Sequence, residues 1–161
     1  YFDGTNDYAQ TNDGFASTSS SVSIEMWVEM YETGTSYARL IGSGGPFAID
    51  VGFENNKVAV YTPTTSGWQL TTTGLSLNTP YHLVIANNKA SNEINVYINS
   101  VNYGTFTGSF ATDAAWHKLG VDYANTSPLE YFCGKMRVYH KNLTSSEVLD
   151  NWLAEKSNYG Y

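Results

Sequence analysis

The chain has few residues that could cross-link it and few charges. Its one cysteine, Cys133, cannot form an intramolecular disulfide, so the fold must be stabilised by its packed core. The residues around Cys133 are apolar, which predicts a thiol that packs as a small hydrophobic side chain. Only 14% of the residues are charged, and 8 Lys and Arg against 15 Asp and Glu give a net charge of −7. Nucleic acids and anionic membranes require a basic face, so this composition argues against both partners.

Long apolar runs are also missing. No run approaches the roughly 20 residues of a transmembrane helix, so we expect no membrane insertion. No repeat, linker or low-complexity segment divides the 161 residues, which predicts one domain spanning residues 1–161. Because the chain begins at Tyr1 rather than with a methionine, we expect it to be processed or to be part of a longer protein.

The dominant pattern that is present is an alternation of apolar and polar residues. Between residues 21 and 31 every second residue is apolar, which predicts a strand, because a helix would scatter these residues around its surface. The apolar face consists of Val22, Ile24, Met26, Val28 and Met30. Turn residues separate further strands, predicted at 39–43, 47–53, 57–62, 69–72, 81–87, 93–99, 101–107, 116–123 and 132–139.

Only one helix is predicted, and it lies near the C-terminus. Thr144 and Glu147 form a capping box, and apolar residues follow at helical spacing (Val148, Leu149, Trp152 and Leu153). Many short strands with no helix between them indicate an all-β fold. We therefore expect a two-sheet antiparallel β-sandwich of the jelly-roll type with one short C-terminal α-helix.

Four segments, in order along the chain, carry a resemblance to a known family. They are residues 1–8 (YFDGTNDY), 23–28 (SIEMWV), 81–84 (YHLV) and 131–148 (YFCGKMRVYHKNLTSSEV). Together they resemble strands of the laminin-G-like branch of the concanavalin A-like lectin/glucanase superfamily. The resemblance implies a concanavalin A-like sandwich. In the closing segment Arg137 directly follows Met136 where the family has an Asp, so we expect that strand to be a residue or two short.

The tail adds a second resemblance. Residues 148–160 are similar to the ending of laminin-G-like domains in tailed-phage and other viral structural proteins. This similarity implies a non-catalytic module on a virion surface, as a capsid decoration or a fibre or spike domain. Such a module would bind a neighbouring coat protein, host glycans or both, and could form a homo-oligomer. The alternatives are a carbohydrate-binding module of a secreted bacterial enzyme or adhesin, which would be extracellular, and a glucanase-type glycoside hydrolase.

Catalysis on this fold requires paired acids. Glycosidases of the superfamily resemble one another in an ExDxE strand, whereas here Trp27 stands between Glu25 and Glu29. Residues four apart on a strand have Cα atoms about 13 Å apart, farther than the roughly 5–9.5 Å between catalytic carboxyl groups. We therefore expect no enzymatic activity and interpret both glutamates as solvated strand carboxylates.

Glycan binding on this fold combines an aromatic platform with amide and carboxylate groups on loops, because sugar rings stack on aromatic faces and sugar hydroxyls need hydrogen-bond partners. The candidates are Trp68, and Asp122, Tyr123 and Asn125 in a second loop. Trp68 could instead pack against the sheet, and the second loop could be purely structural. Both alternatives remain open.

A structural calcium ion is the one cofactor that the sequence suggests. Calcium binds carboxylate, amide and carbonyl oxygens, which Asp3, Asn6 and Asp7 supply within one turn, and some laminin-G-like relatives hold calcium near this region. The alternative is that these side chains only make hydrogen bonds within the turn.

Calcium binding at Asp3, Asn6 and Asp7 predicts a higher melting temperature. We expect the midpoint to rise by several degrees in calcium relative to EDTA, because a ligand that binds only the folded state stabilises it. Differential scanning fluorimetry measures the shift. An unchanged melting curve would exclude the calcium site.

Overall fold

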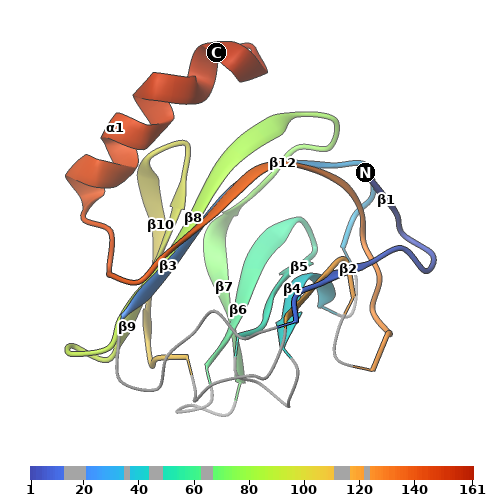
Figure 1. Cartoon of the computed structure of the whole chain (residues 1–161), viewed down its shortest axis with the longest axis horizontal. Helices are drawn as coiled ribbons and strands as arrows, with labels where there is room; N and C mark the ends of the chain where they lie inside the picture. Colours follow the sequence, from blue (N-terminus) through green and yellow to red (C-terminus); the bar gives the residue numbers. More distant parts are fainter. Residues whose placement is uncertain (13–20, 35–36, 44–48, 63–66, 111–116, 122–123) are drawn as a thin grey trace.

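Two six-stranded antiparallel sheets form the body of the computed structural model (Figure 1), which describes all residues except 13–20, 35–36, 44–48, 63–66, 111–116 and 122–123. The first sheet has the strand order β1 (Phe2–Asp3), β12 (Glu130–Tyr139), β3 (Val22–Met30), β8 (Pro80–Asn88), β9 (Glu93–Ile98) and β10 (Val101–Thr107). The second sheet has the order β2 (Ala9–Gln10), β11 (His117–Leu119), β4 (Ala38–Ser43), β5 (Val51–Glu54), β6 (Lys57–Thr62) and β7 (Gly67–Gly74). The predicted two-sheet sandwich is confirmed.

The predicted strands match the observed strands closely where turn residues bound them. β6 and β10 have the predicted bounds, and Asn99 and Ser100 turn between β9 and β10 with φ values of 48° and 69°. Positive φ at both positions is the geometry of a type I′ hairpin turn, whose twist matches that of the strands. Of the predicted strand 47–53, Ile49 and Asp50 lie outside β5 (Val51–Glu54), and residues 47–48 lie outside the described residues. β12 is not short but, at 10 residues, is the longest of the described strands.

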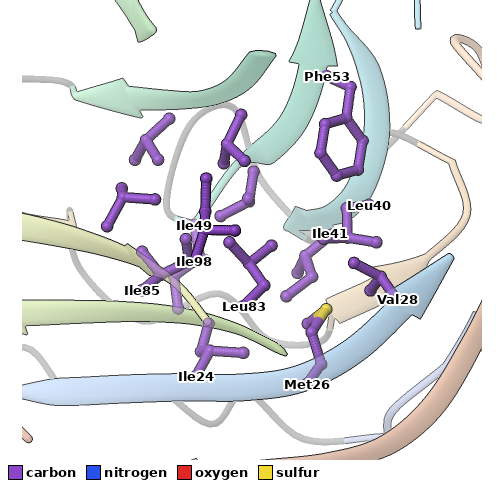
Figure 2. Packing of buried hydrophobic residues seen from close by; sticks show 14 of the residues in the cluster. Ile24, Met26, Val28, Leu40, Ile41, Ile49, Phe53, Leu83, Ile85 and Ile98 are labelled. Atoms are coloured by element: carbon purple, nitrogen blue, oxygen red, sulfur yellow. The ribbon is translucent and has the colours of Figure 1, made fainter. Parts of the chain in front are cut away.

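The core lies between the two sheets. The alternate residues of β3 that the sequence predicts for one face all belong to it, and Ile24, Met26 and Val28 are at most 1% exposed. Figure 2 shows them in one cluster with Leu40 and Ile41 of β4. Burial of these side chains drives the sheets together, at about 1.5–3 kcal/mol for each large aliphatic residue.

The other face of the first sheet is covered by the C-terminal helix α1 (Ser145–Glu155) and the 3-10 turn η1 (Lys156–Tyr159) (Figure 1). The predicted capping box is present, with the Glu147 N–H donating to Thr144 Oγ1. Tyr159 stacks on Trp27 with ring centroids 3.9 Å apart. An added Cβ at Gly134 would lie 2.8 Å from Tyr159 Oη, so glycine makes room for this stacking.

Glu155 holds the helix on the sheet through ion pairs and hydrogen bonds. Its carboxylate accepts hydrogen bonds from Trp27 Nε1 at 3.1 Å, Lys135 Nζ at 2.6 Å and the guanidinium of Arg137. The hydrogen bond from Arg137 is the largest cause that lowers the pKa of Glu155 from its ordinary value of 4.5 to about 2. A carboxyl group with a lowered folded-state pKa stabilises the fold above its unfolded-state pKa, and this contribution is lost as the pH falls.

This linkage predicts an acid-sensitive docking of α1. Between pH about 4.5 and about 2 the melting temperature should fall, and Glu155→Gln should flatten this part of the pH profile. Thermal melts followed by circular dichroism test the prediction. Asp150→Asn, on the exposed side of the same helix, is the matched control. A Glu155→Gln profile that parallels the wild type would contradict the role of this carboxylate.

Candidate functional site

The outer face of the second sheet, directed away from the core, carries the candidate functional side chains. Directly opposed residues on paired strands share a face, and Arg39, Gly52 and Ala59 oppose one another across β4, β5 and β6. Their chain neighbours Val51 and Val58 belong to the core. Arg39, Gly52 and Ala59 therefore lie on the outer face.

Three aromatic rings, Tyr37, Tyr61 and Trp68, lie together on this face, and we call them the aromatic cluster. Trp68 opposes Tyr61 across β6 and β7, with ring centroids 5.6 Å apart in an edge-to-face arrangement. Tyr37 stacks on Trp68 at 4.7 Å with an interplanar angle of 11°, and the Arg39 guanidinium lies 4.3 Å from the centroid of Trp68. All three rings are half-buried, so each keeps some surface for a ligand.

Backbone geometry holds the aromatic cluster in place. Tyr37 has a φ of 56°, a conformation rare for residues other than glycine, asparagine and aspartate, and its N–H donates to Glu54 Oε2 at 2.8 Å. A Cβ at Gly52 would lie 2.5 Å from the carbonyl oxygen of Ala38, so β4 and β5 approach closely only because residue 52 is glycine. The cluster is thus pre-formed rather than assembled by a ligand.

One ion pair stands beside the rings. Arg39 Nε lies 3.9 Å from Asp50 Oδ1, and both residues are at most 9% exposed. Arg39 also donates from its guanidinium to the carbonyl oxygen of Tyr37. Fixed polar groups next to aromatic surface are what recognition of a polyhydroxylated ring requires.

The predicted glycan-binding residues meet only in part. Trp68 is half-buried and belongs to the aromatic cluster. Asn125 is exposed and accepts a hydrogen bond from Lys118 Nζ. Asp122 and Tyr123 lie outside the described residues. Whether the four residues bind glycan stays a prediction.

The sequence pattern alone did not point to Tyr37, Arg39, Asp50 or Tyr61. A usable signal exists for two of them. Arg39 is a charged residue that begins an otherwise uncharged strand, and Tyr61 is two residues from Ala59, so both were assignable to the outer face by alternation. The contact between Tyr37 and Trp68 joins residues 31 apart and depends on strand pairing, which the sequence does not specify.

The N-terminal turn that carries Asp3, Asn6 and Asp7 contains hydrogen bonds within the turn. Asp3 Oδ1 accepts from the N–H of Thr5 at 2.8 Å and of Asn6 at 3.4 Å. Within the described part of the chain, no group of three or more His, Cys, Asp and Glu side chains is placed to hold a metal ion. The calcium site at Asp3, Asn6 and Asp7 stays a prediction.

The expectation that Glu25 is solvated is wrong. Its side chain is 1% exposed and accepts hydrogen bonds from Arg137 Nη1, Tyr139 Oη and Asn151 Nδ2, each at 2.7 Å. Burial by itself would raise the pKa of Glu25, but hydrogen bonds from His82 and Tyr139 and the charge of Arg137 lower it overall. A general acid needs a raised pKa and access to substrate, so this environment argues against a catalytic role for Glu25.

A pocket lies apart from the aromatic cluster. A pocket of about 230 Å³ opens between β7 and β10, and it contains none of the predicted site residues; its lining includes Leu75, Tyr81, Asn99, Val101 and Tyr103. In the parts of the chain that the structure describes, no helix has the length and apolar character to span a membrane.

Comparison with known protein families decides the relationship. A family model, Laminin_G_3, described as the concanavalin A-like lectin/glucanases superfamily, matches residues 3–149. The chain belongs to this superfamily. A search of curated proteins finds no match to this sequence.

Solved structures share its fold at low sequence identity. Domain 4 of AbnA, a GH43 extracellular arabinanase from Geobacillus stearothermophilus solved with arabinotriose, is 22% identical with a TM-score of 0.68, and the match covers 88% of this chain and 70% of that one. The binding domain of botulinum neurotoxin serotype G is 12% identical with a TM-score of 0.74, covering 97% of this chain and 42% of that one. A botulinum neurotoxin type C structure, 12% identical with a TM-score of 0.67, covers 86% and 36%. The chain thus spans less than half of the neurotoxin chains.

The buried position of Glu25 predicts a structural rather than a catalytic phenotype. Glu25→Ala should destabilise the protein by about 3–5 kcal/mol, because it removes the buried acceptor shared by His82, Tyr139 and Asn151 and one of the two carboxylates that pair with Arg137. Glu29→Ala, on the same strand but half-buried, should change stability by only about 0.5 kcal/mol. Urea denaturation measures both. Wild-type stability of Glu25→Ala would show that the network does not stabilise the fold.

Proposed function

We propose that this protein is a non-catalytic carbohydrate-binding module that contacts sugar through the aromatic cluster, Arg39 and Asp50. The observation that carries the proposal is the arrangement of three half-buried rings and one ion pair on the same face of the second sheet. This combination matches the two surfaces of a sugar. The C–H faces of the ring stack on aromatic side chains, and hydroxyl groups bond to the accessible edge of the guanidinium, which the buried Asp50 holds in place.

The pre-formed geometry favours binding. A ligand that meets side chains already held in place does not have to offset the entropy of ordering them, which costs about 0.5–1.5 kcal/mol for each flexible side chain. Tyr37 is fixed by the hydrogen bond from its N–H to Glu54, and Arg39 is fixed by Asp50.

Two solved structures of the same fold support a role in carbohydrate recognition. Domain 4 of the arabinanase was solved with arabinotriose, and cell entry of the type C neurotoxin depends on two ganglioside molecules. At 12–22% identity these structures show a shared fold, so the proposal for this chain rests on its own aromatic cluster.

The module has a separate side for attachment to a carrier. α1 covers the outer face of the first sheet (Figure 1). The aromatic cluster lies on the outer face of the second sheet, as the strand register shows. Attachment through the helix side would leave the sugar-binding side exposed. We infer display outside the cell, with the similarity of residues 148–160 to viral domains favouring a virion as carrier and the arabinanase domain favouring a secreted enzyme.

Removal of Trp68 should abolish most glycan binding. Trp68→Ala should weaken binding at least tenfold, about 1.4 kcal/mol, because it removes the ring that both Tyr37 and Arg39 contact. The measurement is a glycan array followed by isothermal titration calorimetry with the best glycan. Phe132→Ala, an exposed aromatic of the first sheet, is the matched control.

Three outcomes would contradict this proposal. Full binding by a folded Trp68→Ala protein would place the sugar elsewhere. Absence of binding to any neutral or acidic glycan on the array by the folded wild-type protein would favour a purely structural module. Release of reducing ends from polysaccharides would overturn the non-catalytic assignment.

A further inference from the structure

We infer that the pocket between β7 and β10 is a separate binding site, which takes a small neutral molecule made of one aromatic ring and a hydrogen-bond acceptor. The pocket has a volume of about 230 Å³ and shares no residue with the aromatic cluster. The inference therefore goes beyond the proposed function and does not depend on it.

Irregular strand pairing on both sides shapes the pocket. β7 and β10 are the last strands of their sheets. The register of β10 against β9 shifts at Tyr103, which has no opposing residue on β9, and the register of β7 against β6 shifts over the stretch that contains Thr73. The hydroxyl of Thr72 donates to the carbonyl oxygen of Tyr103 at 3.2 Å and joins the two stretches. Bulges redirect side chains and are common beside binding sites, and here Tyr103 and Thr73 both line the pocket.

The inner part of the pocket is apolar. Leu75 and Ile98 are each 4% exposed and belong to the core cluster, in which Figure 2 labels Ile98. The half-buried rings of Tyr81 and Tyr103 pack against the same cluster, and Val101, 52% exposed, lines the pocket on its solvent side. An apolar ring that enters the pocket therefore replaces water against aliphatic and aromatic side chains, which is favourable.

One polar group of the pocket is held in place. The hydroxyl oxygen of Tyr81 accepts a hydrogen bond from the Ser76 N–H at 3.0 Å. A tyrosine hydroxyl donates as well as accepts, and the proton of Tyr81 has no acceptor among the residues that the structure describes. A carbonyl oxygen attached to a bound ring can accept this proton.

The lining excludes ions and sugars. None of the described residues that line the pocket is charged, so a bound carboxylate or ammonium group would lose its hydration without gaining a partner. A sugar would bury hydroxyl groups against Leu75 and Ile98, whose side chains offer no hydrogen-bond partner. A neutral and largely apolar ligand remains.

The volume sets the size of that ligand. An apolar cavity of roughly 150 Å³ holds one benzene molecule. At about 230 Å³, this pocket has room for one aromatic ring with a substituent of a few atoms.

The test compares four probes by NMR of the full chain with labelled methyl groups at Leu75, Ile98 and Val101. Acetophenone, a neutral aromatic ketone, should shift all three signals with a dissociation constant of about 0.5 mM, as expected for a ligand of its size. Toluene keeps the ring but lacks the acceptor, and should bind about fivefold more weakly. Benzoate, which is charged, and methyl glucoside, which is a sugar, should leave the three signals unchanged.

Two variants locate the site. Tyr81→Phe should weaken acetophenone binding about fivefold and leave toluene binding unchanged, because it removes only the donor. Tyr8→Phe, at an exposed tyrosine outside the pocket, is its control. Val101→Trp should weaken both probes at least tenfold, because the larger side chain fills the pocket. Leu149→Trp, at an exposed residue of α1, is the control for that change.

Several results would overturn the inference. Absence of methyl shifts with acetophenone and toluene would show that the pocket holds no aromatic ring. Equal affinity for the two probes, or equal weakening of both by Tyr81→Phe, would remove the hydrogen-bond acceptor from the ligand. Binding of benzoate or methyl glucoside at these methyl groups would assign another ligand class. None of these results bears on the proposed function, which the glycan array and Trp68→Ala test at the aromatic cluster.

Discussion

Burial of β3 on both of its faces is the constraint on which the rest of the structure depends. Met26 and its alternate neighbours pack into the core between the sheets, while Glu25 and Trp27 lie beneath the C-terminal segment. A chain without a disulfide has to order its last residues by contacts alone, and these two side chains supply them. Stacking of Tyr159 on Trp27 and the hydrogen bonds to Glu25 and Glu155 join strands and helix into one unit.

This arrangement separates the side of the molecule that the helix covers from the side proposed to bind ligand. The first sheet has its outer face occupied by α1, and its buried ionic groups are satisfied within the protein. The second sheet is not covered by this helix, and its outer face carries rings and an ion pair held in fixed positions. The stabilising contacts of the helix and the proposed ligand contacts thus lie on opposite faces of the sandwich.

The fold could be predicted further from the sequence than the site could. Alternation along β3 and the capping box at Thr144 are local signals, and each determines one element by itself. The burial of Glu25 was not predicted, because alternation shows which residues share a face but not what covers that face. Trp68 was found as an isolated aromatic residue. Its partner Arg39 lies on β4, three strands away in the sheet, and Tyr37 directly precedes β4, so both contacts depend on strand order and register. Long-range pairing, rather than any local preference, creates the aromatic cluster.

The placement of α1 opposite the aromatic cluster has a consequence for assemblies. A carrier that holds several copies by their helix sides would present all their sugar-binding faces in one direction, towards a surface. Once one copy has bound a glycan-coated surface, the next copy binds at a high local concentration of sugar, and the total avidity can exceed each single affinity by about 10²–10⁴-fold. A shallow face with a few rings is then sufficient for firm attachment, because valency supplies the strength that one module lacks.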